Sequence, residues 1–304
     1  MILFLAKGVN AQGEWNNWYF GIKAGLSFQN GNPLSVPYSE IQCSIITASI
    51  SDSSGQTLFY AHGFVVYNRL HQYMINGTDL MGGQIQGCQP VVAFENLSLE
   101  NAYYIFTVNE YTTQPPPITP TAGLRYNIVD MGLDNGNGAI IEGEKNIPVP
   151  GGENMSTCIT ATRQQNNHDT WVIGRSVATG DDFFVAIPVN KGAVGSRITS
   201  NSTINCNNGL IQPKHIKINY NGDKLVCLYV SSSSQSEFCT FNKSTGTVTP
   251  LFKFSPLIGN PYSAEFSLDG KKLYILEHRS NYDDLIVQYD ATLTDLAAFM
   301  NSAT

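Results

Sequence analysis

Two stretches near the C-terminal end of the chain share one pattern of apolar and polar positions. Residues 215–229 and 263–277 each alternate apolar with polar residues, pass through an Asn-Gly or Asp-Gly dipeptide, and resume the alternation. Alternation is typical of half-buried strands, and these dipeptides signal hairpins because both turn residues tolerate positive φ. Gly222 and Gly270 lie 48 residues apart, so the pattern predicts one hairpin in each of two repeated units.

Three weaker copies of this pattern precede the clear pair. When the second strands are aligned, the steps between units are 46, 67, 54 and 48 residues, with the alignment anchored at Leu58, Tyr104, Trp171, Leu225 and Leu273. β-Propeller repeats are about 40–50 residues long. The longest step contains the Pro-rich segment 114–122, which we interpret as a surface excursion because proline removes ladder hydrogen bonds from a strand.

The predicted fold is all-β, a β-propeller of four-stranded blades. The third strands end alike, at Asp130, Asn242 and Asp290, each before a turn, and a β-sandwich would not impose this order at this period. About five blades are recognisable after residue 43, and a further strand is expected at 15–21. Propellers usually close with four to eight blades, so the count leaves open a ring that is incomplete at its C-terminal side. We assign residues 13–304 to one propeller domain.

Composition favours an extracellular protein. Only 13% of the 304 residues are charged, about half the usual share of roughly 25%, and Asn, Ser, Thr, Gln and Gly replace them. The net charge of −7 argues against nucleic acid as a partner. We interpret residues 1–12 as the remnant of a signal peptide; the alternative is a buried strand. No apolar run reaches the roughly 20 residues that span a bilayer, so no membrane insertion is predicted.

The six cysteines form no metal-binding motif. Their closest spacing exceeds that of a C-x-x-C knuckle, which argues against a zinc ribbon. Most are expected to be small buried side chains in strands, with at least one disulfide as the alternative. The positions are Cys43, Cys88, Cys158, Cys206, Cys227 and Cys239.

Several segments carry a resemblance to a known family: 18–28, 48–60, 74–81, 102–108 and 126–131. Their order resembles the N-terminal propeller of large cell-surface proteins from Bacteroidetes-type bacteria. Such proteins typically end in a gliding-motility-associated or type IX secretion sorting domain. The resemblance implies secretion or display on the outer-membrane exterior. A looser similarity links the repeats to lactonase-like and TolB-like propellers.

Motifs for catalysis are missing from the sequence. The five histidines do not form an H-E-x-x-H pair, and neither a G-x-S-x-G elbow nor a G-x-G-x-x-G phosphate loop is present. The segment 134–138 reads as a Gly-rich turn rather than a calcium loop. The paired carboxylates at 181–182 and 283–284 read as solvated turn residues. We therefore predict no catalytic residue, metal or cofactor.

The best candidates for a binding site come from the first strands of the two clear units. His215 and Lys217 share one phase of the first hairpin, and Ser263 and Glu265 take the equivalent positions in the second. In a propeller these strands lie nearest the central channel, so the four side chains could converge there on a ligand or metal. The alternative is a solvated or mutually bonded channel lining.

Two functions remain open at this stage. The preferred one is a non-enzymatic binding, adhesion or structural module for a protein or carbohydrate ligand, contacted through loops rich in Asn, Thr and Tyr. The alternative is a lactonase-like hydrolase with a polar or metal site in the central channel.

Overall fold

The computed structural model shows a chain built almost entirely from β-strands. The description covers residues 13–36, 38–43, 46–83, 89–109, 123–177, 182–206, 213–229, 235–257, 259–278 and 284–304. The signal-peptide interpretation, Cys88 and the Pro-rich segment 114–122 fall outside these residues.

The described residues form six antiparallel sheets, numbered here I to VI in chain order. Sheet I contains β1 (Asn17–Phe20), β2 (Ala24–Ser27) and β3 (Leu34–Ser35). Sheet II contains β4 (Ala48–Ser51), β5 (Thr57–His62) and β6 (Val65–Asn68). Sheet III contains β7 (Val91–Glu95), β8 (Ala102–Asn109), β9 (Gly123–Asp130), β10 (Ala139–Ile140) and β11 (Ile147–Pro148).

The C-terminal half follows the same plan. Sheet IV contains β12 (Met155–Arg163), β13 (Thr170–Ser176), β14 (Phe183–Asn190), β15 (Ala193–Val194) and β16 (Ile198–Asn201). Sheet V contains β17 (Pro213–Ile218), β18 (Lys224–Tyr229), β19 (Ser236–Asn242) and β20 (Thr247–Phe254). Sheet VI contains β21 (Asn260–Phe266), β22 (Lys272–His278) and β23 (Asp284–Asp290). The short helices are η1 (Gly13–Trp15), η2 (Asp134–Gly136) and α1 (Leu296–Asn301).

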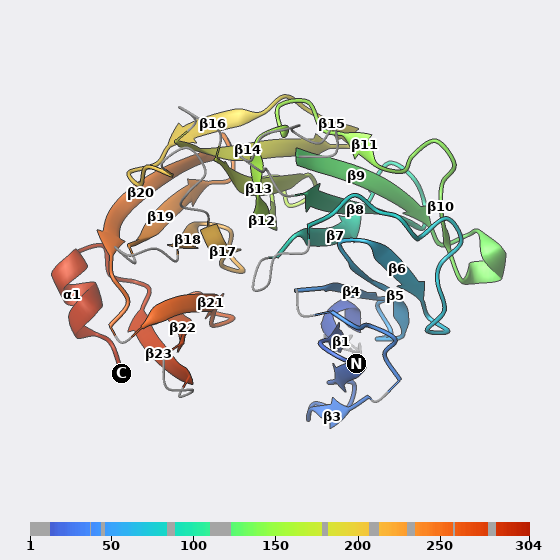
Figure 1. The fold of residues 1–304 in the computed structure, drawn as a ribbon, viewed down its shortest axis with the longest axis horizontal. Coiled ribbons are helices and arrows are strands. Elements are labelled where there is room, and N and C mark those ends of the chain that lie inside the picture. The colour runs from blue at the N-terminus through green and yellow to red at the C-terminus, as the bar shows by residue number, and fades with distance from the viewer. Residues whose placement is uncertain are drawn as a thin grey trace, which may run out of the picture.

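The sheets follow one another around an arc, with sheets I and VI at its two ends (Figure 1). The first strand of each sheet contacts the first strand of the next, from β1 and β4 through β7, β12 and β17 to β21. This radial order of sheets, with first strands innermost, confirms the predicted propeller-type fold. Five units after residue 43 are confirmed, and the expected N-terminal strand is part of a three-stranded sheet.

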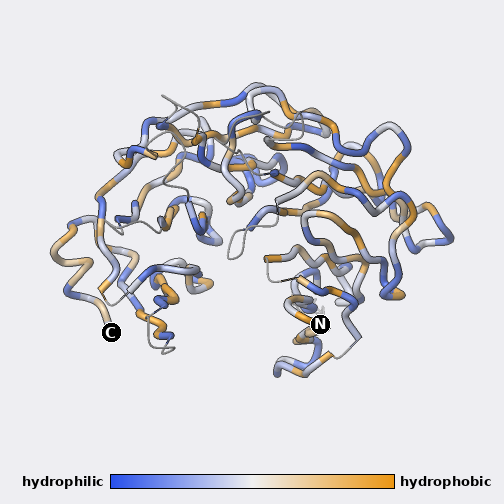
Figure 2. The backbone as a smooth tube through the Cα atoms, viewed as in Figure 1, coloured by the Kyte–Doolittle hydropathy of each residue, from blue (hydrophilic) through white to orange (hydrophobic). Residues whose placement is uncertain are grey.

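An apolar cluster fills the space between each pair of consecutive sheets. There are five such clusters among the described residues, one at each junction from I–II to V–VI. One buried member of each, in that order, is Tyr60, Ile105, Phe106, Cys227 and Phe238. Hydrophobic segments recur along the strands of every sheet (Figure 2). A fully buried aromatic side chain such as Phe238 contributes about 1.5–3 kcal/mol of transfer free energy, so inter-sheet packing is the main stabilising contact.

The two diagnostic hairpins are present, but their turns differ from the expected two-residue type. Only the glycines have positive φ, 73° at Gly222 and 68° at Gly270. Gly222 N donates to Asn219 O at 3.0 Å, and Gly270 N donates to Ser267 O at 2.8 Å. Each loop is therefore a four-residue turn that ends in a left-handed glycine.

The aligned residues of the second strands do not all face the same way. Leu225 and Leu273 face the preceding sheet, in the clusters between IV and V and between V and VI. Leu58, Tyr104 and Trp171 instead face the following sheet. A slip of one residue moves a side chain to the other face of a strand, and burial on both faces of β8 and β13 hid the difference.

Not every blade has four strands. Sheet VI has three, and α1 packs against β20 and β23 beside them. Asp295 caps this helix by accepting a hydrogen bond from Ala298 N at 2.9 Å. Phe299 of α1 is fully buried in the cluster between sheets V and VI. Within the described residues, no helix is both long enough and apolar enough to cross a membrane.

Candidate functional site

The four predicted channel residues lie on β17 and β21, and the structure separates their roles. His215 is almost fully buried, and its Nδ1 accepts a hydrogen bond from Ala264 N at 2.8 Å. Burial, with a smaller contribution from the Lys217 charge, lowers the pKa of His215 to about 3. The imidazole is therefore neutral at pH 7, and its hydrogen bond joins sheet V to sheet VI.

Lys217 and Glu265 form the closest contact among the predicted residues. Lys217 Nζ lies 2.7 Å from Glu265 Oε2, and the glutamate side chain is 62% exposed. Ser263 is partly exposed on the same strand as Glu265. This ion pair is compatible with the alternative of a mutually bonded lining. A ligand-binding role for these residues remains a prediction.

Of the paired carboxylates, the structure describes Asp182 and Asp284. Asp182 accepts a hydrogen bond from Cys206 N at 2.8 Å, and Asp284 Oδ1 lies 2.6 Å from His278 Nδ1. Asp181 and Asp283 fall outside the described residues. Across the described part of the chain, no group of three or more His, Cys, Asp or Glu side chains could hold a metal ion.

A buried polar network, which the sequence reading missed, joins sheets IV and V. Arg175 and Glu237 are both fully buried. Arg175 Nε donates to Tyr229 Oη at 2.6 Å, and Tyr229 Oη donates to Glu237 Oε2 at 3.3 Å. Glu237 also accepts hydrogen bonds from Ser202 Oγ, Thr203 N and Thr203 Oγ1 at 2.6–2.7 Å. The signal was present in the sequence, because both charges occupy the apolar phase of their strands.

Thiols surround this network. Burial raises the pKa of Cys206 to about 11 and raises the pKa of Cys227 further. Cys158, Cys206, Cys227 and Cys239 are buried thiols in the same apolar cluster. For these four, the interpretation as small core residues is confirmed.

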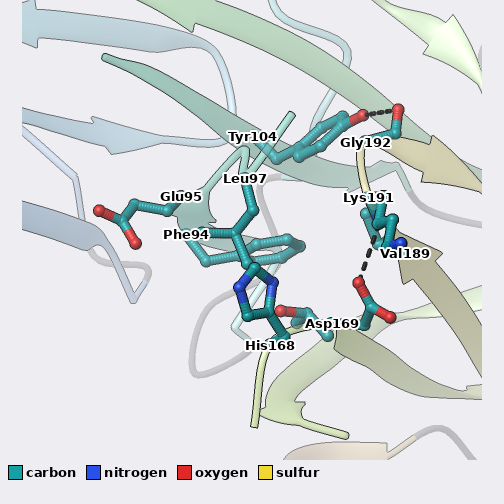
Figure 3. Close-up of a pocket in the computed structure, with 10 residues that line it drawn as sticks. Phe94, Glu95, Leu97, Tyr104, His168, Asp169, Val189, Lys191 and Gly192 are labelled. Carbon is teal, nitrogen blue, oxygen red and sulfur yellow. Dashed lines mark hydrogen bonds between the residues drawn. The ribbon is translucent and has the colours of Figure 1, made fainter. Parts of the chain in front are cut away.

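A surface pocket lies where turns of sheets III and IV meet (Figure 3). Its cavity volume is ≈ 10 Å³, about enough for one water molecule and far below the roughly 300–1,000 Å³ typical of drug-sized ligand sites. The lining residues are Phe94, Glu95, Leu97, Tyr104, His168, Asp169, Thr170, Val189, Lys191 and Gly192.

The pocket walls are fixed by hydrogen bonds between the two sheets and within the turns. Tyr104 Oη donates to Gly192 O at 2.6 Å, and Lys191 N donates to Asp169 Oδ1 at 2.9 Å. Asn166 Nδ2 donates to Asp169 Oδ2 at 2.8 Å. Gly192 has a φ of +79°, and an added Cβ would lie 2.7 Å from Ser98 Cβ, so glycine permits the close approach of the two turns.

The chemistry of the pocket is mixed. Phe94 supplies a partly buried ring, and His168 and Lys191 are exposed at the rim. The Lys191 backbone N–H, with weaker contributions that include Asn166, lowers the pKa of Asp169, so its carboxylate is ionised at pH 7. In Figure 3 the Glu95 carboxylate points away from the other labelled side chains. The pocket therefore offers an apolar floor with a cation, an anion and an imidazole around it.

The fold and pocket define a propeller-type β-protein with a small, loop-built surface site. The sequence matches no protein-family model and no curated protein. Among solved structures, it is similar to a protein provisionally named a 6-phosphogluconolactonase from Bacteroides fragilis, with 14% identity, a TM-score of 0.43, and 92% of this chain and 89% of that chain covered.

Two further solved structures show the same level of similarity. Hsv2 from Kluyveromyces lactis has 10% identity and a TM-score of 0.49, with 92% of this chain and 72% of that chain covered. A gluconolactonase from Xanthomonas campestris has 12% identity and a TM-score of 0.38, with 84% and 76% covered. Similarity at this level says nothing about activity.

Proposed function

We propose that the chain is a non-enzymatic binding module that contacts a carbohydrate or protein ligand through the turns of sheets III and IV. The observation that carries this proposal is the pocket beside Phe94, whose walls are held by Tyr104–Gly192 and Asp169–Lys191 hydrogen bonds. A site whose walls are fixed before binding loses less conformational entropy when a ligand arrives.

Carbohydrate is the ligand class that best fits this chemistry. A sugar ring presents an apolar face and a rim of hydroxyl groups. Phe94 and Leu97 offer apolar contact, and Asp169 and Lys191 offer an acceptor and a donor. The cavity of ≈ 10 Å³ is too small to enclose a sugar ring, so the ring would lie on the surface against these side chains.

An array of bacterial and host glycans, probed with the full chain, tests this proposal. Binding is expected for the unaltered protein and at least a tenfold loss for a His168→Ala/Lys191→Ala double variant, since both side chains are exposed at the rim. Tyr220→Ala is the matched control, because Tyr220 is 63% exposed on the turn between β17 and β18. Equal binding by the double variant, or no glycan bound by the unaltered chain, contradicts the proposal.

Lactone hydrolysis in the central channel is the competing function. The ion pair of 2.7 Å between Lys217 and Glu265 occupies the charges such a site would use. We expect no hydrolysis of glucono-δ-lactone above the uncatalysed rate in a pH-stat assay. Turnover that disappears in Glu265→Gln and persists in the pocket double variant would replace the binding proposal with a hydrolase.

Export and display on the cell surface form part of the same proposal. The support comes from the low charged fraction of 13% and from the resemblance to surface propellers of Bacteroidetes-type bacteria. Fractionation of the source cells, followed by protease treatment of intact cells, measures this directly. Protein found only inside the cells would contradict it.

A further inference from the structure

Four tyrosine rings stand in series from the junction of sheets I and II to the surface. Tyr19 of β1, Tyr60 of β5 and Tyr67 of β6 are buried, whereas Tyr73 is 64% exposed. The ring centroids of Tyr19 and Tyr60 lie 4.4 Å apart, and those of Tyr60 and Tyr67 lie 5.1 Å apart. The centroids of Tyr67 and Tyr73 lie 5.3 Å apart. Each ring is therefore in direct contact with the next, and we call these four residues the tyrosine series.

The hydroxyl of Tyr60 meets a base. His71 Nδ1 lies 3.0 Å from Tyr60 Oη. Glu40 N donates to the same Oη at 3.2 Å, which leaves the phenol proton to point at Nδ1. A base at roughly 2.6–3.2 Å from a proton is positioned to take it. Tyr19 Oη has the hydroxyl of Thr57 at 2.8 Å instead, so within this stack the base stands at Tyr60.

The surroundings of His71 suit a transient positive charge. Burial lowers the pKa of His71, so the ring is neutral at pH 7 and able to accept a proton. The Glu40 carboxylate, which Lys23 Nζ contacts at 2.9 Å, acts in the opposite direction on this pKa and favours the imidazolium once it forms. Burial raises the pKa of Tyr60 to about 12. The phenol therefore keeps its proton at pH 7 unless it also loses an electron.

We propose that the tyrosine series takes up a one-electron oxidation at Tyr73 and stores it as a neutral radical on Tyr60. The oxidant is a diffusible one-electron acceptor, such as an organic radical or a high-valent metal complex, and it is reduced by one electron. Tyr73 loses that electron first and regains one from Tyr60 through Tyr67. Any proton that Tyr73 releases to water is taken back when its electron returns.

The oxidation ends at Tyr60 because its proton has a destination there. The Tyr60 O–H bond breaks, the proton moves to His71 Nδ1, and the unpaired electron stays on the phenoxyl ring. Tyr60 is fully buried, so the radical is shielded from other molecules, whereas Tyr73 stays accessible to the oxidant. A thiol or another one-electron reductant reverses the step by returning one electron, and the proton then moves back from His71. This activity is separate from the pocket of sheets III and IV.

Flash photolysis of the full chain, with photogenerated tris(bipyridine)ruthenium(III) as the oxidant, tests the proposal. The absorption of the neutral tyrosyl radical is followed over time. We expect a long-lived radical component in the unaltered chain and its loss in Tyr60→Phe, which keeps the buried ring. His71→Asn should lose the component too, because an amide accepts the hydrogen bond but does not take the proton. Asparagine also tolerates the φ of +61° at position 71.

Tyr73→Phe and Tyr220→Phe are a matched pair, since these tyrosines are 64% and 63% exposed and only Tyr73 belongs to the series. The long-lived radical should form in lower yield in the Tyr73 variant and in unchanged yield in the Tyr220 variant. Circular dichroism checks that all variants are folded.

A second measurement needs no variant. Electron paramagnetic resonance of the frozen, oxidised chain in D₂O should show an exchangeable deuteron coupled to the phenoxyl radical, from the hydrogen bond of protonated His71. Absence of this coupling overturns the proposal. An unchanged long-lived component in Tyr60→Phe or His71→Asn overturns it as well, and so do equal yields from the two surface variants.

Discussion

Replacing Glu237 by glutamine is expected to destabilise the protein strongly without changing the shape of the side chain. Glu237 Oε1 accepts hydrogen bonds from Thr203 N and Oγ1, and Oε2 accepts from Ser202 Oγ, all at 2.6–2.7 Å. An amide NH₂ in the Oε1 position would face the Thr203 backbone N–H, donor against donor. In the Oε2 position it would remove the acceptor of the Ser202 and Tyr229 hydroxyls, which would have to turn to other partners. The same change removes the fully buried negative charge that faces Arg175 through Tyr229.

The magnitude follows from these contacts. Loss of one partner of a buried charged network costs about 3–5 kcal/mol, which agrees with about 1–3 kcal/mol for each buried donor left unsatisfied. A chain of this length loses roughly 2–3 °C of Tm for each kcal/mol. We therefore expect Glu237→Gln to lower Tm by about 6–15 °C.

Thermal unfolding followed by circular dichroism measures this effect. Glu100→Gln is the matched control, since Glu100 is an exposed turn residue, and its Tm should stay unchanged. The double variant Arg175→Met/Glu237→Gln should lose less stability than the sum of the single variants, because removing both charges leaves neither unpaired. A shift below about 2 °C for Glu237→Gln, or strict additivity, would refute the reasoning.

Two further predictions concern the hairpins and the inner strands. The pKa of His215 is about 3 in the folded protein, whereas the pKa of a histidine in an unfolded chain is about 6.5. Between these values the unfolded state binds a proton that the folded state does not. The free energy of unfolding therefore falls as the pH drops from about 6.5 towards 3. His215→Asn keeps an acceptor for the neighbouring strand and should flatten stability over this range in urea titrations, whereas the exposed His168→Asn should not. Gly222→Ala should destabilise the protein by more than Gly136→Ala, because both have positive φ but only the Cβ at 222 would clash, at 2.5 Å from Thr162 Oγ1. Equal Tm values for the two alanine variants would contradict that account.

Local chemistry made the fold predictable. The hairpins around Gly222 and Gly270 depend on turn residues and on alternating strands that are adjacent in sequence. These features repeat, so even degenerate copies could be found upstream. The register of Trp171 was not predictable, because its strand is buried on both faces (every residue of β13 is buried) and alternation then carries no signal.

The pocket could not be predicted for a different reason. Phe94, His168 and Lys191 come from three segments that meet only when sheets III and IV pack. None has a sequence spacing that implies contact. The alternation of the inner strands led instead to His215. Its apolar neighbours lower its pKa, so this histidine is a neutral hydrogen-bond acceptor in the core.

The buried glutamates of sheets V and VI show how repetition and charge are connected. Glu237 binds Thr203 N, in the segment that leads from sheet IV into sheet V, and Glu277 accepts a hydrogen bond from Gly259 N at 3.1 Å, in the segment that leads from sheet V into sheet VI. A tyrosine hydroxyl donates to each carboxylate at 3.3 Å, from Tyr229 and Tyr289.

The glutamate and the tyrosine of each pair occupy opposite strands in the two sheets. The glutamate is on the third strand of sheet V and on the second strand of sheet VI, and the tyrosine takes the other position. The tyrosine–glutamate–backbone contact is present in both sheets, although its residues occupy different strands. This indicates that the fold needs a hydrogen-bond acceptor where one sheet connects to the next. A backbone N–H that enters a sheet interface needs a buried partner. Among the described residues, the buried carboxylates of Glu237 and Glu277 therefore mark the connections between consecutive sheets.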